Sequence, residues 1–298
     1  MVLDGFLAAG LLLATPILLA ALGELLVERT GVLNIGVEGM MLLGAFVAAV
    51  AAAGFQDAWI GALAAGAAGM LAGAFFAWCT LYLRTDQIIV GAALNLLALG
   101  GTGALYRALY GSTGSVLVLP TLPAVGIPGL DWLLGAQSGL AYLALVLVPL
   151  LALLFGRTGL GLRLRALGEH PVAAASLGYP VRRYRLVTLL CSGFLSGLAG
   201  AALTLSASDT FVEGVTSGRG FVALAVVVFG RWSPWGILAG SMIFGLAGAL
   251  QFQLQAASFA IPHQIALMLP YILTLVVLVT SPGRAVAPRA LGAAEDDA

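Results

Sequence analysis

RTGLGLRLRALGEHPVAAASLGYPVRRYR, residues 157–185, is a charged interruption between two long apolar stretches, and it contains six of the thirteen basic residues of the chain. Inside it, GEHPVAAASLGYP predicts a short helix, with His170 as its cap and Pro171 at its first position. Gly178 lies just past the expected end, and Pro180 blocks continuation. Such a helix suits the docking of a soluble partner. An ordinary loop made basic by membrane topology would contain the same arginines.

The composition predicts a membrane protein made of helices. The chain has 298 residues, of which 61% are hydrophobic and 9% charged, and its mean hydropathy is +1.07. Soluble domains contain roughly 25% charged residues. We therefore expect an all-α, polytopic transmembrane bundle that forms one domain over residues 1–285, followed by a tail at 286–298. The net charge is zero, so nothing favours nucleic acid as a partner.

All thirteen basic residues are arginine. A phosphate-binding loop of the GxxxxGK[ST] type needs a lysine, so the chain contains none. Any work driven by ATP must therefore be done by another polypeptide.

The sequence contains about nine apolar membrane segments. All are long enough to span a bilayer except one short segment near 219–231. They lie near 6–26, 32–53, 59–83, 87–106, 139–156, 186–207, 221–230, 234–251 and 264–281. If all nine cross and the N-terminus is outside, eleven of the thirteen arginines fall on the cytoplasmic side, as does the C-terminus. If 221–230 re-enters instead, the split falls to eight against five. The charge distribution favours nine crossings, with the short segment beside a pathway rather than lipid.

Two further patterns predict packing. Small residues recur every four positions in the third and sixth segments, which lets helices approach closely in lipid. They are Gly61, Ala65, Gly69, Gly73 and Ala77, and then Gly193, Gly197 and Ala201. The outside loop, 107–138, is rich in proline and apolar residues, so we expect it to fold back over the outer mouth.

Catalytic residue sets are sparse. The histidines are His170 and His263, and the sequence predicts no metal site, cofactor or catalytic group. Glu24 and Glu28, beside Arg29, suggest solvation at a helix end or a local ion pair.

Asn34 and Glu38 are four residues apart and so share one helix face in a glycine-rich stretch. They either serve the pathway directly or bond the backbone groups that a bend sets free.

Several stretches resemble the integral-membrane permeases of bacterial ABC importers, in the branch that contains simple-sugar and branched-chain amino-acid permeases. They are ERTGVLNIGVEGMMLLGAF (28–46), RALGEHPVAAASLGYPV (165–181) and GRGFVALAVVVFGRWSPWG (218–236). TDQIIVGAALNLLALGGTGALYRALYGSTG (85–114) and IPHQIALMLPYILTLVVL (261–278) resemble the shorter permease of nucleoside importers. The resemblance covers roughly residues 15–285.

The resemblance implies a permease subunit in the bacterial inner (plasma) membrane that forms half of a translocation pathway for nucleosides. It implies three partners: a second, longer permease, a cytoplasmic ATPase, and an extracytoplasmic substrate-binding lipoprotein. The 157–185 loop would then couple to the ATPase, through positions that match the family pattern. These are Gly168, Glu169, His170, Pro171, Ala173, Ala174 and Gly178. Position alone suggests a substrate pathway along Asn34, Glu38, Gln87, Asn95 and Phe221.

Three rival interpretations remain open. The same importer class could carry a pentose or another simple sugar, or a branched-chain amino acid. An ion-coupled secondary transporter would work without an ATPase. A membrane-embedded enzyme is disfavoured by the sparse catalytic residues.

Overall fold

A computed structural model describes residues 2–111, 119–126, 135–256 and 286–293. The long helices are α1 (Val2–Glu28), α2 (Val37–Phe55), α3 (Ala58–Ala77), α4 (Gln87–Tyr110), α6 (Gly139–Arg157), α9 (Val181–Ala202) and α11 (Pro234–Ala256). The shorter helices are α7 (Gly159–Glu169), α8 (Pro171–Ser176) and α10 (Arg219–Phe229). Single π-helical turns, Trp78–Tyr82 and Leu203–Ala207, extend α3 and α9. Strands β1 (Ala124–Val125) and β2 (Gln137–Ser138) form one small antiparallel pair.

The architecture is an all-α bundle. Seven helices within the described parts of the chain are long and apolar enough to cross a bilayer. They correspond to seven of the nine segments expected from the sequence. The segment expected at 221–230 lies in α10, which has 11 residues, and the segment at 264–281 lies outside the described residues. Nine crossings and the orientation of the termini therefore stay predictions.

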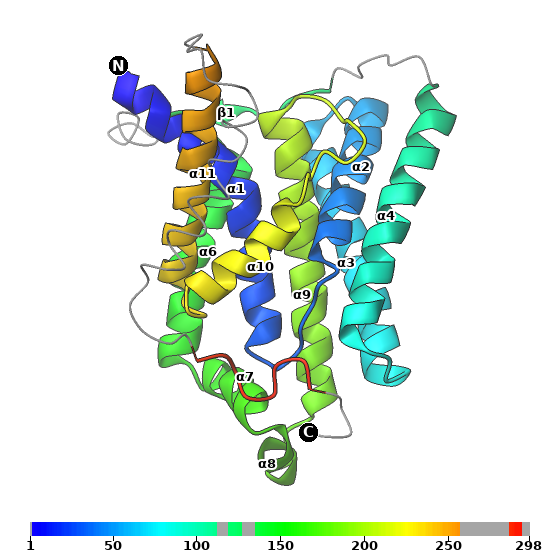
Figure 1. Ribbon diagram of the computed structural model, residues 1–298, viewed down its shortest axis with the longest axis vertical. Helices are drawn as coiled ribbons and strands as arrows, with labels where there is room; N and C mark the ends of the chain where they lie inside the picture. The colour runs from blue at the N-terminus through cyan, green and yellow to red at the C-terminus, as the bar shows by residue number, and fades with distance from the viewer. Residues whose placement is uncertain (1, 112–118, 127–134, 257–285, 294–298) are drawn as a thin grey trace.

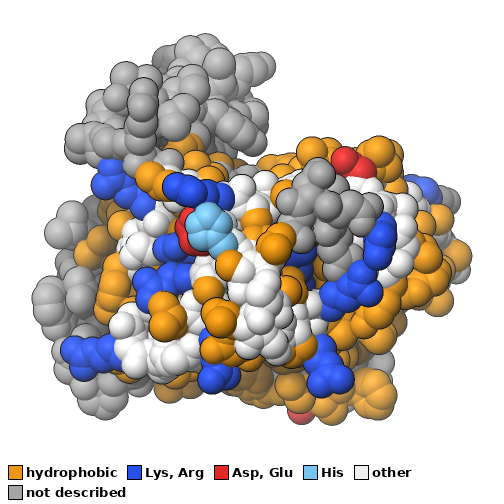
Figure 2. Space-filling view, turned by 90° about the horizontal axis from the view of Figure 1, so that it is seen from below, with side chains coloured by type: hydrophobic (Ala, Val, Ile, Leu, Met, Phe, Trp, Pro, Cys, Tyr) orange, Lys and Arg blue, Asp and Glu red, His pale blue; other side chains and the backbone are white. Residues whose placement is uncertain are grey.

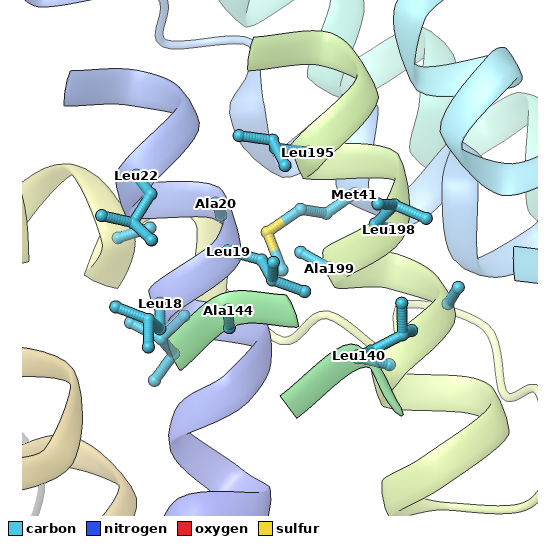
Figure 3. Close-up of a cluster of buried hydrophobic side chains, with 14 of the residues drawn as sticks. Leu18, Leu19, Ala20, Leu22, Met41, Leu140, Ala144, Leu195, Leu198 and Ala199 are labelled. Atoms are coloured by element: carbon cyan, nitrogen blue, oxygen red, sulfur yellow. The ribbon is translucent and has the colours of Figure 1, made fainter. Parts of the chain in front are cut away.

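Helices α1 and α9 lie in the middle of the bundle (Figure 1). Helix α9 packs against α1, α2 and α3, whereas α1 also packs against α10 and α11. Helix α4 lies at one edge, beside α2. Leucine and alanine side chains from α1, α6 and α9 meet Met41 of α2 in the core, where Leu19, Ala144 and Ala199 lie close together (Figure 3).

The contact between α3 and α9 confirms the prediction from the small residues. A Cβ atom added to Gly69 would overlap the backbone of Gly193, and one added to Gly197 would overlap the carbonyl oxygen of Ala65. The two backbones therefore touch directly. In lipid, where burial of apolar surface does not drive association, such close packing is a main source of helix–helix affinity.

The described parts of the 107–138 loop pack onto the bundle. Leu119 and Leu122 are buried, and their backbone N–H groups donate to the backbone carbonyls of Asp209 (3.2 Å) and Leu205 (2.9 Å). The Tyr142 hydroxyl donates to the carbonyl of Val125 at 2.6 Å. This end of the molecule is opposite the end that carries α7 and α8 (Figure 1).

Candidate functional site

The connection between α1 and α2, residues 29–36, is held by hydrogen bonds to several other elements of the bundle. Gly31 adopts a φ of 86°, which favours glycine, and α2 begins only at Val37. The turn leaves backbone N–H and C=O groups without helical partners. Inside a membrane such groups cost several kcal/mol each when unpaired, so something must bind them.

Two side chains of α4 bind these freed groups. The Gln87 Oε1 accepts from Leu33 N at 2.7 Å. Asn95 accepts from Gly39 N at 2.7 Å and donates to the carbonyl of Ile35 at 3.0 Å. Both were predicted to line a pathway, and that role stays a prediction. In the structure their side chains bond the backbone of the turn and of the first residues of α2.

Asn34 binds the turn to α1. Its backbone N–H and its side-chain amide donate to the two carboxylate oxygens of Glu24, at 3.0 and 3.3 Å. The Ser192 hydroxyl of α9 donates to the same carboxylate at 3.3 Å. The Asn34 Oδ1 also accepts from Gly36 N at 3.1 Å. Asn34, Glu24 and Ser192 are fully buried, so this cluster joins α1, α9 and the turn without access to water.

Glu38, in the first turn of α2, holds the beginning of α10. Its Oε1 accepts from the Thr216 hydroxyl (2.6 Å) and from Gly218 N (2.8 Å), and its Oε2 accepts from Gly220 N (2.7 Å). The first N–H groups of a helix have no partner within it, and they favour negative charge. The carboxylate therefore acts as a cap supplied by another helix.

The far end of α10 is held by the end of α1. Trp232, just beyond α10, donates its indole N–H to Glu28 at 2.5 Å, and Arg29 donates to the Trp232 carbonyl at 2.6 Å. Burial, together with the neighbouring Arg165 guanidinium, lowers the pKa of Arg29, whereas Glu169 opposes this effect. Glu28 and Glu38 thus lie on either side of the turn and form hydrogen bonds at opposite ends of α10.

Helices α7 and α8 form the loop that the sequence singled out. Pro171 occupies the first position of α8 and Gly178 follows it with a φ of 83°, as predicted. His170 occupies the N-cap position, as predicted, although its side chain makes no capping hydrogen bond. Helix α8 projects from the lower end of the bundle (Figure 1), and Figure 2 shows arginine side chains spread over this face.

One face of α8 packs inward and the other is exposed. Pro171 and Ala174 are buried, whereas the side chains of Val172 and Leu177 are 59% and 77% exposed. The remaining predicted coupling positions divide in the same way: Gly168 is buried, Glu169 is half-buried, and His170, Ala173 and Gly178 are exposed.

A model of a protein family described as branched-chain amino acid transport system / permease component matches residues 6–278. The chain belongs to this family. The permease is 36% identical over 306 residues to a guanosine ABC transporter permease protein of Bacillus subtilis, with 98% of this chain and 96% of the relative covered. It is 33% identical to a nucleoside ABC transporter permease protein of Lactococcus lactis, over 95% and 93% of the two chains.

A putative glucose ABC transporter permease protein of Haloferax volcanii is 38% identical to the permease, over 86% of this chain and 80% of the relative. Bacillus subtilis and Lactococcus lactis each have a second permease protein named for the same substrate, and these are 28% and 24% identical to this chain. The similarity therefore extends, more weakly, to both members of each pair.

The structure brings together four of the five residues suggested for the pathway. Asn34, Glu38, Gln87 and Asn95 all bond within or beside the turn. Phe221 lies on α10, and its side chain is 48% exposed.

Sequence reasoning missed part of this network. Glu24 and Glu28 were expected to be solvated or locally paired, yet they are at most 1% exposed and bind distant groups, so the expected solvation was wrong. Their presence in an otherwise apolar helix was a usable signal, because buried acids are rare in membrane spans and have partners there. Trp232, Ser192 and Thr216 gave no comparable signal.

Proposed function

We propose that the permease is one of two membrane subunits of an ABC importer for nucleosides, and that ATP is bound and hydrolysed on separate subunits. The observation that carries this proposal is the similarity, over nearly the whole chain, to permease proteins named for guanosine and for nucleosides. The absence of lysine from the sequence, which excludes a GxxxxGK[ST] loop, agrees with a separate ATPase.

The second membrane subunit would be a longer paralogue, and a substrate-binding lipoprotein would deliver the solute. The paired permeases of Bacillus and Lactococcus support two different subunits rather than two copies of one. We place the assembly in the bacterial inner membrane.

The end of the bundle that carries α7 and α8 would be cytoplasmic. Arginines spread over that face (Figure 2) support this orientation by the positive-inside rule. The N-terminus would then lie outside. The C-terminus would lie inside after nine crossings, with α10 counted as the short one, and residues 1–285 would be a single domain with a cytoplasmic tail at 286–298.

The loop at 157–185 would contact the ATPase through α8. Its exposed Val172 and Leu177 lie on a face rich in arginine, where apolar side chains gain from being covered by a protein. Glu169, His170 and Ala173 would belong to the contact. Gly168, Pro171 and Ala174 would seat α8 on the bundle, and Gly178 would end it.

Closure of the ATPase subunits would move α8 and shift the two permeases between outward-facing and inward-facing states. The chain itself would make and break no covalent bonds. Phe221, exposed on α10, is the best-placed of the suggested residues to meet the solute, because the other four are engaged with backbone groups.

Reconstitution tests the proposal. Proteoliposomes containing both permeases, the ATPase and the lipoprotein should accumulate radiolabelled uridine, adenosine or guanosine. They should do so only when ATP is present on the side of the membrane where the ATPase is bound. Concentrative uptake by this chain alone, driven by an ion gradient, would refute the mechanism.

A simple sugar is the second candidate cargo, because a putative glucose permease is 38% identical to this chain. Ligand binding by the cognate lipoprotein separates the two. Preference for ribose or glucose over every nucleoside would change the cargo and leave the importer architecture unaffected.

A further inference from the structure

Residues 286–293, here called the strap, do not extend away from the bundle as a free tail. The strap runs along its lower end, between α7 and the end of α1 (Figure 1). Ala290 N donates to the carbonyl of Gly168 at 2.8 Å, and Gly292 N donates to the carbonyl of Gly31 at 3.1 Å. The strap therefore bonds both to the loop that carries α8 and to the turn before α2.

The seat of the strap fits its small residues. Ala290 is 7% exposed, and a Cβ atom on Gly31 would come within 3.1 Å of its carbonyl oxygen. A Cβ atom on Gly168 would lie 2.5 Å from the carbonyl oxygen of Arg29 and 3.2 Å from Pro288, so this glycine mainly allows the loop to approach the end of α1. At Gly31 a Cβ atom would press on the Ala290 carbonyl, so the strap would have to shift by a few tenths of an ångström to accept it.

A groove of about 470 Å³ opens between the strap and the beginning of α8. Its walls are Glu169, His170, Pro171, Val172 and Ala173 on one side and Arg289, Ala290 and Ala293 on the other. The lining is mainly apolar, with the acid Glu169 on one side and Arg289 on the other. Val172, at the α8 wall, is 59% exposed.

We propose that the strap is the second wall of the ATPase-docking surface, so that the ATPase inserts an apolar residue flanked by an acid between α8 and Arg289. This inference rests on the proposed function, because it assumes an ATPase at α8. A protein occupant is favoured over lipid because the groove is continuous with the exposed face of α8, which projects beyond the ends of the long helices (Figure 1).

Site-specific photocrosslinking in the complete importer tests this arrangement. A photoreactive amino acid would replace Val172 on α8, Arg289 on the strap, or Val125, which is 53% exposed at the opposite end. We expect ATPase adducts from positions 172 and 289 and none from 125. Adducts from 172 without adducts from 289 would overturn the inference and leave the proposed function standing.

The other outcomes are equally decisive. If neither 172 nor 289 labels a co-purifying ATPase, the docking role of α8 fails and the strap proposal fails with it. If the photoreactive amino acid at position 289 forms adducts with lipid, as identified by mass spectrometry, the groove faces the membrane and the proposal is wrong. Adducts from 289 alone would refute a shared groove.

A charge reversal gives a second readout. Arg289→Glu should weaken ATPase association several-fold, and the residual association should be less sensitive to salt than that of the unmodified permease. Arg84→Glu, the same change at an exposed position just before α4, outside both the groove and the 157–185 loop, is the matched control and should leave association unchanged. Equal effects of the two substitutions would mean that general surface charge, not the strap, attracts the ATPase.

Discussion

The carboxylate of Glu38, in the first turn of α2, accepts a hydrogen bond from the backbone N–H of Gly220, in the first turn of α10, at 2.7 Å. The two helix beginnings therefore share one charged group. Because Gly220 has no side chain, its backbone approaches Glu38 closely; a Cβ there would lie 2.6 Å from the Glu38 backbone.

Replacing Glu38 should disable transport. Glu38→Gln would turn an amide N–H₂ toward a backbone donor, and Glu38→Ala would leave Thr216, Gly218 and Gly220 without this acceptor. Hydrogen bonds to charged groups contribute about 1.5–3 kcal/mol each. We expect ATP-driven uptake to fall at least tenfold in both variants, together with a lower unfolding temperature in detergent.

The control for Glu38 is another helix-capping carboxylate. Asp57→Ala removes the cap of α3, where Asp57 accepts from Trp59 N at 2.7 Å. It should lower stability by about 1 kcal/mol and leave uptake intact. Transport that survives Glu38→Ala as well as it survives Asp57→Ala would show that the α10 cap has no part in the pathway.

Glu24→Ala should destabilise the permease more than Ser192→Ala. The first change leaves Asn34 N and its side-chain amide without their acceptor, whereas the second removes one weak donor at 3.3 Å. An unpaired buried polar group costs about 1–3 kcal/mol. Thermal unfolding of purified protein would measure the difference, and equal melting temperatures would contradict it.

Gly69→Ala should impair assembly of the bundle. The added methyl group would overlap the Gly193 backbone, and overpacking typically costs about 1–3 kcal/mol. Gly54→Ala, in α2, is the control, because its Cβ would meet nothing within 4 Å. We expect the control to be neutral or slightly stabilising, and detergent melting curves of the two variants should separate clearly.

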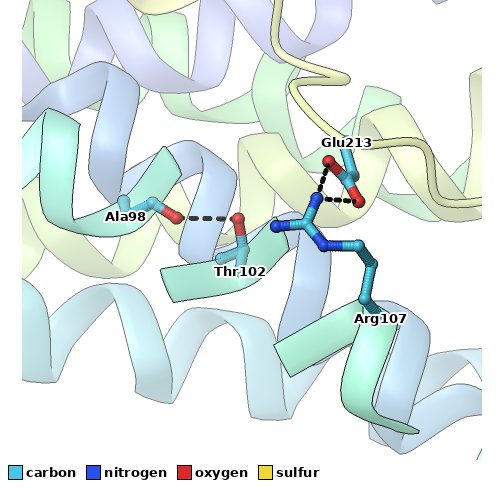
Figure 4. Close-up of polar contacts among 4 residues, drawn as sticks. All are labelled: Ala98, Thr102, Arg107 and Glu213. Atoms are coloured by element: carbon cyan, nitrogen blue, oxygen red, sulfur yellow. Dashed lines mark hydrogen bonds and ion pairs between the residues drawn. The ribbon is translucent and has the colours of Figure 1, made fainter. Parts of the chain in front are cut away.

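The ion pair between Arg107 and Glu213 should matter little. One guanidinium nitrogen contacts both carboxylate oxygens, at 2.8 and 2.7 Å (Figure 4), and the two side chains are 53% and 43% exposed. Exposed pairs contribute about 0–1 kcal/mol and are screened by salt. A double-mutant cycle with Arg107→Ala and Glu213→Ala should give a coupling energy in this range. A value near 3 kcal/mol would contradict it.

Ala174→Glu should abolish stimulation of the ATPase by loaded lipoprotein while membrane insertion remains normal. Ala174 is 4% exposed on the inner face of α8, so a carboxylate there would dislodge the helix. Ala175→Glu, at the exposed neighbouring position, should have a smaller effect. Full stimulation in the Ala174 variant would exclude α8 as the coupling element.

Local signals in the sequence predicted α8 and the close packing of α3 and of α9, although not that these two helices are each other's partners. Pro171 and Gly178 act on their own backbone, and a stripe of small residues has the same meaning wherever its partner lies. Both features could therefore be predicted without knowing the tertiary structure.

The roles of Gln87, Asn95 and Glu24 could not be predicted in this way. Each side chain bonds a backbone or amide group that belongs to another element, 10 to 60 residues away in the sequence. The sequence shows a polar residue in an apolar helix but not which group it meets. The same limit explains why residues 286–293 were expected only as a tail.

The turn at residues 29–36 has a consequence for biosynthesis. Its backbone groups bond to Gln87, Asn95 and Gly292, all of which are synthesised after the turn itself. The connection between the first two helices therefore cannot reach its final form until Gly292 has left the ribosome. Chains truncated before Gly292 should insert their early helices and yet leave this turn open to proteases.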